Sequence, residues 1–359
     1  YGATQVIITT DGAEKVQAIV EVDVIGEGHK AMPQVQTGDG FTIALDKDGV
    51  VWSWGRNDHG QLGDNTTEAR IVPQKVTTFN YADATTQHIV KIKTGNAHTI
   101  ALDSTGKIWV WGLNSLGQVG SGATGDVVKP IQITLPDNAE AVDIGVGETT
   151  SYALDAKGHV YAWGRGEGTT VGYGNVPIKL DLFERIVSIS GKYGLKSDGT
   201  IWNIPDRNAS IVIYSKDTGD TRFVKVASND NNNSKNYHTL LVSTDNKLYT
   251  FGMNDSGELG NGDTQSNATI GLVETDKAGY EIGSVLDIAA GRSYSTAITT
   301  NGVYAWGNND YKQLGTNASI YQERPVKVNY PESMKDKKLK YISAGISHTS
   351  TIDEDGYIW

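Results

Sequence analysis

The stretch HTIALDSTGKIWVWGLNSLGQVG, residues 98–120, decides the fold. Its apolar residues alternate with a period of two on both sides of a short polar segment, as in paired strands, and not with the 3.6-residue period of a helix. Asp103 to Gly106 form that segment. Glycine supplies the positive φ that a tight turn needs, and aspartate can accept hydrogen bonds from the turn backbone. The stretch therefore predicts a β-hairpin followed by a glycine-rich loop.

This hairpin pattern occurs seven times along the chain. The copies lie at residues 41–55, 98–112, 150–164, 193–203, 238–252, 294–307 and 348–359. Their closing glycines Gly55, Gly112 and Gly164 are 57 and 52 residues apart. A regular period of this kind indicates a repeat architecture, in which each unit buries its faces against its neighbours. We expect an all-β fold with helix confined to short turns.

Composition limits the classes of function. The chain has 359 residues and no cysteine, which excludes disulfides, thiolate metal sites and a cysteine nucleophile. Its formal net charge of −11 argues against a general affinity for nucleic acid or for an anionic membrane. No apolar run reaches the roughly 18 residues of a transmembrane helix, and residues 1–30 lack the features of a signal peptide. We expect neither a nucleic-acid partner nor direct membrane insertion.

A glycine-rich tail follows four of the hairpins. The tails are GRNDHGQLG (55–63), GLNSLGQVG (112–120), GMNDSGELG (252–260) and GNNDYKQLG (307–315). Hairpin and tail together resemble the regulator of chromosome condensation repeat. That family forms a seven-bladed β-propeller, so the resemblance implies seven blades of about four antiparallel strands each within residues 31–359. The third and fourth units depart from the pattern, because GRGEGTTVGYG (164–174) lacks the Asn and the Gln-Leu pair and no tail follows Trp202.

Residues 1–30 precede the first repeat and have two interpretations. Their first part, YGATQVIITTDGAEKVQAIVEVDV (1–24), resembles the closing strands of a bacterial immunoglobulin-like domain. Such domains belong to surface or secreted bacterial proteins, so the resemblance implies an extracellular or cell-surface location. Val16 to Val24 also alternate as a half-buried strand does, and such a strand could join the last blade and close the ring. We favour ring closure over a remnant of a separate domain.

Motifs that suggest chemistry have structural interpretations that fit better. The segments Asp46 to Gly49 and Asp353 to Gly356 resemble the start of a calcium loop but lack its closing Glu, so we expect turns. His98, His238 and His348 share one repeat position, and equivalent positions in different blades do not converge on one metal, so we expect structural hydrogen bonds.

Aromatic pairs in the third strand of each unit are expected to pack between blades. These pairs are Trp52/Trp54, Trp109/Trp111, Tyr161/Trp163 and Tyr304/Trp306. No nucleophile with a base and no zinc-protease motif occurs in the sequence. We therefore expect a protein that is not an enzyme and that has no metal and no cofactor.

Loops in which the repeats differ are the candidates for recognition, because a rigid ring orders them before any contact. They are SNDNNNSKN (228–236) and the linkers 77–87 and 274–283. The residues expected to contact a partner are Asn231, Asn232, Asn233, Tyr237, Tyr81 and Tyr280.

The function predicted from the sequence is a non-enzymatic binding or structural module of a bacterial surface or secreted protein. It would recognise a protein partner as a monomeric propeller within a larger chain. The resemblance leaves a second class open, a soluble regulator of one enzyme, since family members include inhibitors of β-lactamases and an exchange factor for a small GTPase. The fold alone does not choose between these classes.

Overall fold

Strands make up nearly all of the regular structure. The computed structural model describes residues 2–9, 17–24, 31–79, 81, 88–165, 172–180, 185–204, 211–212, 221–229, 237–317, 320–330, 332–334 and 336–359. Within these residues the only helical elements are the short 3₁₀ turns η1 (Pro136–Asn138) and η3 (Glu332–Met334). The expected all-β class is confirmed.

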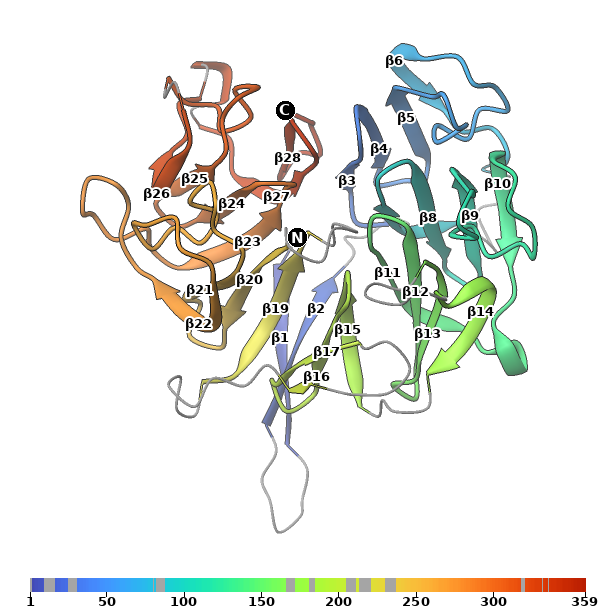
Figure 1. The fold of residues 1–359 in the computed structure, drawn as a ribbon, viewed down its shortest axis with the longest axis horizontal. Helices are drawn as coiled ribbons and strands as arrows, with labels where there is room; N and C mark the ends of the chain where they lie inside the picture. The colour runs from blue at the N-terminus through green and yellow to red at the C-terminus, as the bar shows by residue number, and fades with distance from the viewer. Residues whose placement is uncertain are drawn as a thin grey trace. The chain divides into compact units, whose positions relative to one another are not determined.

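The chain divides into two compact units. One holds residues 25–196 and 203–211, and the other holds residues 1–24, 197–202 and 212–359. Figure 1 shows the strands of both, and each unit is described by itself.

Three antiparallel sheets, here called blades one to three, fill most of the unit that begins at residue 25. In each blade four strands pair in chain order, so every connection is to a neighbour. Blade one is β3 (Gln34–Thr37), β4 (Phe41–Leu45), β5 (Val51–Gly55) and β6 (Arg70–Lys75). Blade two is β7 (Ile89–Thr94), β8 (His98–Asp103), β9 (Ile108–Gly112) and β10 (Val127–Ile133). Blade three is β11 (Ala141–Val146), β12 (Thr150–Asp155), β13 (Val160–Gly164) and β14 (Gly174–Leu180).

Blade four has the shortest strands, as the departures in its sequence suggest. Its strands pair in the order β15 (Ile186–Ser190), β16 (Tyr193–Lys196), β17 (Ile201–Asn203) and β18 (Ile211–Val212). Its fourth strand is reduced to two residues.

The second unit holds two further four-stranded blades and two smaller sheets. Blade five is β19 (Phe223–Ser228), β20 (His238–Ser243), β21 (Leu248–Gly252) and β22 (Asn267–Val273). Blade six is β23 (Val285–Ala290), β24 (Tyr294–Thr299), β25 (Gly302–Gly307) and β26 (Gln322–Lys327). The seventh repeat forms a two-stranded sheet of β27 (Leu339–Ala344) and β28 (Thr349–Asp353).

The prediction of seven four-stranded blades is wrong. The described residues form six such blades, and the seventh repeat contributes only β27 and β28. After its turn, residues 357–359 make a single bridge, Ile352 to Ile358, and backbone hydrogen bonds between Thr351 and Trp359. Three residues are too few for a third and a fourth strand, whereas the tail and outer strand of blade two occupy residues 113–133. Counting hairpins in the sequence therefore overestimated the number of complete sheets.

The N-terminal strands β1 (Gly2–Thr9) and β2 (Gln17–Val24) pair with each other in an antiparallel sheet of their own. Both interpretations of residues 1–30 require strands in this segment, so the presence of β1 and β2 does not choose between them. Ring closure by this segment therefore stays a prediction, as does the alternative of an immunoglobulin-like remnant.

Hairpin turns within the blades are held by the aspartate that precedes them. Asp103 Oδ1 accepts hydrogen bonds from the backbone N–H groups of Thr105 (2.9 Å) and Lys107 (3.1 Å), and its Oδ2 accepts one from Trp109 Nε1 (2.9 Å). Asp353 makes the same set of contacts, ending with Trp359 Nε1 at 3.0 Å. The aspartates are occupied by the turn and by the first aromatic residue of the next strand, as the turn interpretation predicts.

Consecutive blades are joined at a repeated contact, here called the seam. The main-chain carbonyl of Gln61 in blade one accepts hydrogen bonds from Thr99 Oγ1 (3.1 Å) and Trp111 Nε1 (2.8 Å) of blade two. In the other unit the carbonyl of Glu258 accepts from Ser295 Oγ (2.8 Å) and Trp306 Nε1 (2.7 Å) in the same way. These two seams thus satisfy both lone pairs of one buried carbonyl. Between blades two and three the carbonyl of Gln118 accepts a hydrogen bond from Ser151 Oγ (2.7 Å), but buried Trp163 Nε1 has no hydrogen-bond partner among the described residues.

The apolar core consists of separate clusters, each of which lies at one seam. One cluster combines Phe41 and Leu62 of blade one with Ile92 and Trp111 of blade two, all almost fully buried. Equivalent clusters join blades two and three, blades five and six, and blade six and the seventh repeat. The inner tryptophans Trp111, Trp163 and Trp306 are completely buried in these clusters, which confirms the predicted packing between blades. Trp109, by contrast, is half-buried and belongs to its own turn.

We expect replacement of Trp111 by Ala to lower the free energy of unfolding by about 3–5 kcal/mol, because it leaves a large cavity and removes a hydrogen bond. Trp111→Phe should cost less, since it keeps most of the ring, and half-buried Trp109→Ala serves as the matched control. Urea unfolding measures all three. Equal losses for Trp111→Ala and Trp109→Ala would contradict the assignment of Trp111 to the seam.

Glu258 replaces the glutamine that stands at this position in three other tails. Its side chain is 5% exposed and accepts a hydrogen bond from the backbone N–H of Ser256 (2.8 Å). Burial raises the pKa of Glu258 above its ordinary value of 4.5. A carboxyl group whose pKa is raised by folding leaves stability intact below the unfolded pKa and lowers stability as pH rises through that value.

Glu258→Gln should therefore raise the free energy of unfolding at pH 7, by an amount on the order of 1 kcal/mol for one buried polar group. The gain should shrink as the pH falls toward 4.5. The reciprocal variant Gln61→Glu is the control and should lose stability at pH 7. Denaturation measured between pH 4 and pH 8 tests both, and a pH-independent difference would contradict the role of the buried charge.

Candidate protein-binding surface

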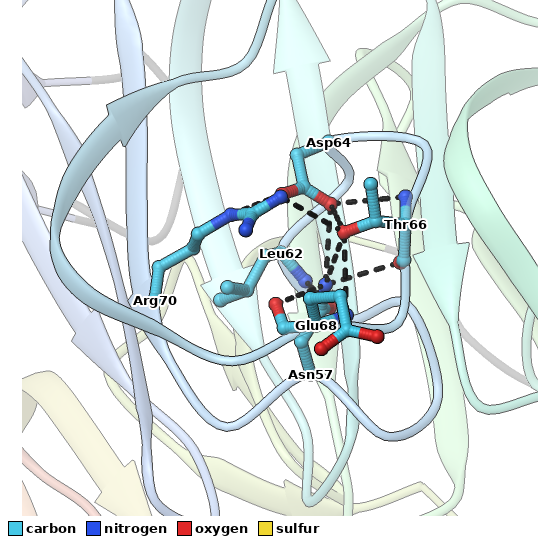
Figure 2. A network of polar contacts seen from close by, with 6 residues as sticks. All are labelled: Asn57, Leu62, Asp64, Thr66, Glu68 and Arg70. Atoms are coloured by element: carbon cyan, nitrogen blue, oxygen red, sulfur yellow. Dashed lines mark hydrogen bonds and ion pairs between the residues drawn. The ribbon is translucent and has the colours of Figure 1, made fainter.

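In blades one, two, five and six the loop between the third and fourth strands is built around one buried asparagine. Figure 2 shows it in blade one, where Asn57 is completely buried. Asn57 Oδ1 accepts a hydrogen bond from the backbone N–H of Leu62 (2.9 Å). Its Nδ2 donates to the carbonyls of Thr66 (3.0 Å) and Glu68 (3.1 Å) and to Asp64 Oδ1 (3.1 Å). One side chain therefore ties both ends of the loop together.

A second layer of contacts closes the same loop. Asp64 accepts hydrogen bonds from Thr66 Oγ1 (2.7 Å) and Arg70 Nε (2.8 Å), which Figure 2 also shows. Burial by itself raises the pKa of Asp64, but the hydrogen bonds from Thr66 and Arg70 outweigh it and lower the pKa below its usual value. Asp64 is therefore ionised at neutral pH and supports the loop most strongly there.

The loops of other blades repeat this design. Asn114, Asn254 and Asn309 are completely buried and accept hydrogen bonds from Val119, Leu259 and Leu314, respectively. The loops of blades one, two, five and six also have the same length. They form a set of rigid supports on which only the exposed side chains vary.

The first strands of the blades carry ion pairs that are structural. Lys91 of blade two pairs with Asp143 of blade three, whose carboxylate also accepts hydrogen bonds from the backbone N–H groups of Ile144 (2.7 Å) and Ile189 (3.2 Å). Lys225 and Asp287 form the same arrangement in the other unit, with 2.8 Å between Nζ and Oδ1. Because each carboxylate is buried and fully hydrogen-bonded, these charges are suited to joining blades and not to catalysis.

The histidines of the repeat are buried at the seams. His98 Nε2 lies 3.1 Å from Ser151 Oγ of the next blade, and burial lowers the pKa of His98 to about 4. Burial likewise lowers the pKa of His238 to about 3, opposed by a hydrogen bond to the backbone of Tyr294. Both histidines are therefore neutral at physiological pH. The predicted hydrogen bonds are present at His98 and His238, and each reaches the following blade. His348, the third histidine of the prediction, is only half-buried.

Tyr81 and Tyr280, two of the residues predicted to contact a partner, differ in how exposed they are. Tyr81 is half-buried, accepts a hydrogen bond from the backbone N–H of Val51 (3.2 Å) and donates one to the carbonyl of Val76 (2.8 Å). It fastens a linker to blade one, and burial raises its pKa. Tyr280, by contrast, is 72% exposed at the tip of a turn in which Asp276 Oδ1 accepts from its backbone N–H (2.9 Å).

The remaining candidates precede β20 in the sequence. Tyr237 is half-buried, and its carbonyl accepts a hydrogen bond from the backbone N–H of Met253 (2.8 Å). Asn231, Asn232 and Asn233 lie outside the residues that the structure describes. Tyr237 directly precedes the second strand of blade five, whereas the Tyr280 turn follows its fourth strand, so the two lie at opposite ends of that blade. A contact role for these residues stays a prediction.

The loop of blade six carries three large apolar side chains that are exposed. Tyr311, Ile320 and Tyr321 are 74%, 60% and 42% exposed. The backbone N–H of Tyr311 donates to Gln313 Oε1 (2.9 Å), so the loop has the same support as its counterparts. These residues are not among those predicted to contact a partner. The sequence does set Tyr311 apart, because Tyr311 and Lys312 stand in the tail GNNDYKQLG at the two positions where the other tails have His-Gly, Leu-Gly or Ser-Gly.

No group of three or more histidine, aspartate or glutamate residues is placed to hold a metal ion in the described part of the chain. Over the same residues, no helix has the length and apolar character that crossing a bilayer requires. The features that the described blades do offer are rigid loops with variable exposed side chains.

Asn57→Ala should destabilise the loop of blade one by about 2–3 kcal/mol, since buried backbone groups would lose their partners. Amide exchange should become faster at Leu62, whose N–H donates to Asn57. Asn57→Asp is the matched control, because it retains the acceptor but not the donors and should lose an intermediate amount. Unchanged exchange at Leu62 in Asn57→Ala would contradict the central role of this side chain.

Comparison with known proteins identifies the repeat. The model of the "Regulator of chromosome condensation (RCC1) repeat" matches residues 48–102, 105–154, 245–298 and 301–352, more than half of the chain. A second model of the same repeat matches residues 34–61, 89–118 and 285–313. The interval between residues 154 and 245 contains blade four, where the tail motif is missing from the sequence.

Curated relatives share this repeat. The chain is 27% identical over 344 residues to the ultraviolet-B receptor UVR8 of Arabidopsis thaliana, covering 89% of this chain and 74% of the receptor. It is 26% identical over 321 residues to the mitochondrial RCC1 domain-containing protein RUG3 of Arabidopsis thaliana, covering 89% of this chain and 62% of that protein. It is 25% identical over 335 residues to the E3 ubiquitin-protein ligase HERC2 of Homo sapiens, covering 91% of this chain but only 6% of the ligase.

Solved structures agree on the fold. Yeast RCC1 (Prp20), in its complex with Kap60, superposes with a TM-score of 0.74 at 18% identity, covering 90% of this chain and 81% of that one. Human WBSCR16 superposes with a TM-score of 0.72 at 21% identity, covering 94% and 90%. These likenesses confirm a β-propeller fold, and the family supports a protein-binding or regulatory module. On its repeats and its matched residues, the chain belongs to the regulator of chromosome condensation (RCC1) repeat family.

Proposed function

We propose that the chain is a non-enzymatic module that binds a protein partner through the loop of blade six. The observation that supports this most is the exposure of Tyr311, Ile320 and Tyr321, which all belong to the loop between the third and fourth strands of blade six. Exposed aromatic and aliphatic side chains on an ordered backbone are typical of binding hot spots, because little conformational entropy is lost on contact. Tyr280, on the turn that follows blade five, would add a second exposed tyrosine.

Replacing Tyr311, Ile320 and Tyr321 together by Ser should weaken partner binding at least about tenfold, a loss of 1.4 kcal/mol or more. Ile71→Ser with Val72→Ser is the matched control, because these residues of blade one are 97% and 53% exposed. The test compares the stoichiometric protein retained from an extract of the source organism by each purified variant. If both variants retained the partner protein equally well, the partner would have to bind a surface other than the loop of blade six.

A second candidate is a soluble regulator of one enzyme, resembling either a β-lactamase inhibitor or an exchange factor for a small GTPase. Its support comes from a relative of known structure, since Prp20p of Saccharomyces cerevisiae binds Gsp1p and histones. We expect no acceleration of fluorescent-nucleotide release from a small GTPase, because the matched loops of blades one, two, five and six carry no insertion. A clear acceleration of nucleotide release would favour the enzyme regulator over the binding module.

The finer proposal places the module on a bacterial surface or in a secreted protein. Its support is the resemblance of residues 1–24 to a bacterial immunoglobulin-like domain. The relatives described above come instead from a plant, from yeast and from humans. Fractionation of source cells with an antibody against the chain tests this location, and recovery in the cytosolic fraction alone would contradict it.

A further inference from the structure

The outer strand of blade five, β22, differs from its counterparts in carrying neither a proline nor a charged residue. β22 (NATIGLV) is the last strand of its sheet, and Figure 1 shows it at the outer edge of blade five. The other outer strands of similar length each have one proline and at least one lysine or arginine; they are β6 (RIVPQK), β10 (VVKPIQI), β14 (GNVPIKL) and β26 (QERPVK). Proline and lysine on an edge strand hinder pairing with a further strand. β22 therefore lacks the protection that its counterparts have.

Two residues of β22 stand directly in the place of those protective residues. In the register of the strand pairs, Ile270 occupies the position of Pro325 in β26, and Leu272 occupies that of Lys327. The same two positions hold proline and then lysine or glutamine in β6, β10 and β14. Leu272 is 39% exposed, so an apolar side chain lies where the other blades place a polar one.

The backbone groups of these two residues face away from blade five. In blade six the carbonyl of Pro325 accepts a hydrogen bond from the backbone N–H of Lys277 (2.8 Å), which lies outside the sheet, so backbone groups at this position point away from β25. Residues two apart on an antiparallel strand direct their backbone groups to the same side, so Leu272 faces outward as Ile270 does. In the described part of the chain, no backbone hydrogen bond joins Ile270 or Leu272 to a segment outside blade five.

The first half of β22 is also uncovered. In blades two, three and six, the carbonyl two residues before the proline accepts a backbone hydrogen bond from the loop of the preceding blade. The pairs are Val128 with Asn65 (2.9 Å), Asn175 with Gly122 (2.8 Å) and Glu323 with Gly262 (2.9 Å). These three acceptors are half-buried, whereas their counterpart Ala268 is exposed, and the fourth repeat has no glycine tail in its sequence. The uncovered edge thus extends from Ala268 to Leu272.

We propose that this edge binds β22 of a second copy of the chain, so that two fifth blades join into one continuous antiparallel sheet. Main-chain hydrogen bonds between edge strands are an established mode of association. A two-fold axis beside Ile270 would place its N–H against the carbonyl of Ile270 in the other copy. In the same register, Ala268 of each copy lies opposite Leu272 of the other.

The sequence of β22 fits its own copy in this register. Exposed Leu272 meets the small side chain of Ala268, and Thr269 meets Gly271, so large and small side chains complement each other on both sides of the axis. The strand has no charge, so no like charges come together. Since both copies use the same edge, the pairing is complete after two chains. The site uses no residue of the blade six loop, so this proposal and the proposed function can fail independently.

Sedimentation equilibrium of the purified chain tests the dimer from micromolar to millimolar concentration. Moderate salt screens the repulsion between two chains of net charge −11, and the mass should approach twice that of one chain as concentration rises. Ile270→Pro removes the N–H at the axis and should raise the Kd of the dimer at least about tenfold, which corresponds to 1.4 kcal/mol. Ile270→Val keeps that N–H and is the matched control. Leu272→Lys, at an exposed position, should weaken the dimer without altering a buried side chain.

Cysteine cross-linking tests the register, because the chain has no cysteine of its own. Thr269 and Gly271 form a pair without hydrogen bonds across the axis, and the Cα atoms of such a pair lie about 4.5 Å apart, within the range that a disulfide spans. A Cβ on Gly271 would meet only the carbonyl oxygen of Thr250, at 3.9 Å, among the described residues. A mixture of Thr269→Cys and Gly271→Cys chains should therefore form a linked dimer on oxidation, and Thr269→Cys alone should form far less.

Three results would overturn the proposal. The first is a chain that stays monomeric at millimolar concentration, which would leave the edge to a strand of another protein. The second is a dimer that Ile270→Pro and Leu272→Lys both leave unchanged, and the third is equal cross-linking by Thr269→Cys alone. The blade six loop variant should dimerise as the unaltered chain does, which separates this site from the proposed function.

Discussion

A single main-chain carbonyl at each seam is the constraint on which the rest of the structure depends. A buried carbonyl without partners is costly, and its two lone pairs can be filled only by donors that the same blade does not supply. The next blade provides a hydroxyl and an indole N–H, as Thr99 and Trp111 do for Gln61. The glycine two residues after the carbonyl gives the indole its space. Hydrogen bonding and apolar burial therefore depend on the same residues, and the spacing between tail and hairpin has to recur in each repeat.

This constraint separates structural residues from those free to serve recognition. The asparagines of the tails and the turn aspartates use their polar groups within the blade framework, and the buried histidines and inner tryptophans are enclosed by it. A residue that appears in every repeat is therefore poor evidence of function here, and binding has to reside where repeats differ. Blade six illustrates this, because Tyr311 occupies a tail whose asparagine and glutamine keep their usual contacts.

Sequence reasoning predicted the parts of the structure that depend on local pattern. Alternation and turn chemistry placed the hairpins, and the turn at Asp103 and the burial of Trp111 are both confirmed. The number of complete blades was predicted wrongly, because a hairpin in the sequence does not reveal whether third and fourth strands pair with it. Tyr81 was expected on an exposed loop, but its hydroxyl is held between Val51 and Val76, a contact 30 residues apart in the chain. Tyr311 was missed because exposure depends on which neighbouring blade covers a position, and periodicity carries no such information.

At one position of the tail, the choice between glycine and a larger residue depends on how closely the next blade approaches. Gly60, Gly117 and Gly257 lie under the outer strand of the following blade, whose Cα atoms would be 2.5–2.6 Å from an added Cβ. Since any side chain there would push the two blades apart, glycine at this position indicates a close neighbour. Lys312 adopts the same backbone and replaces that glycine in the blade whose neighbour has only two strands. Stability in a repeat protein is approximately a sum of terms for units and for contacts between neighbours. The residue at position 312 therefore marks where one such contact between neighbouring units changes in kind.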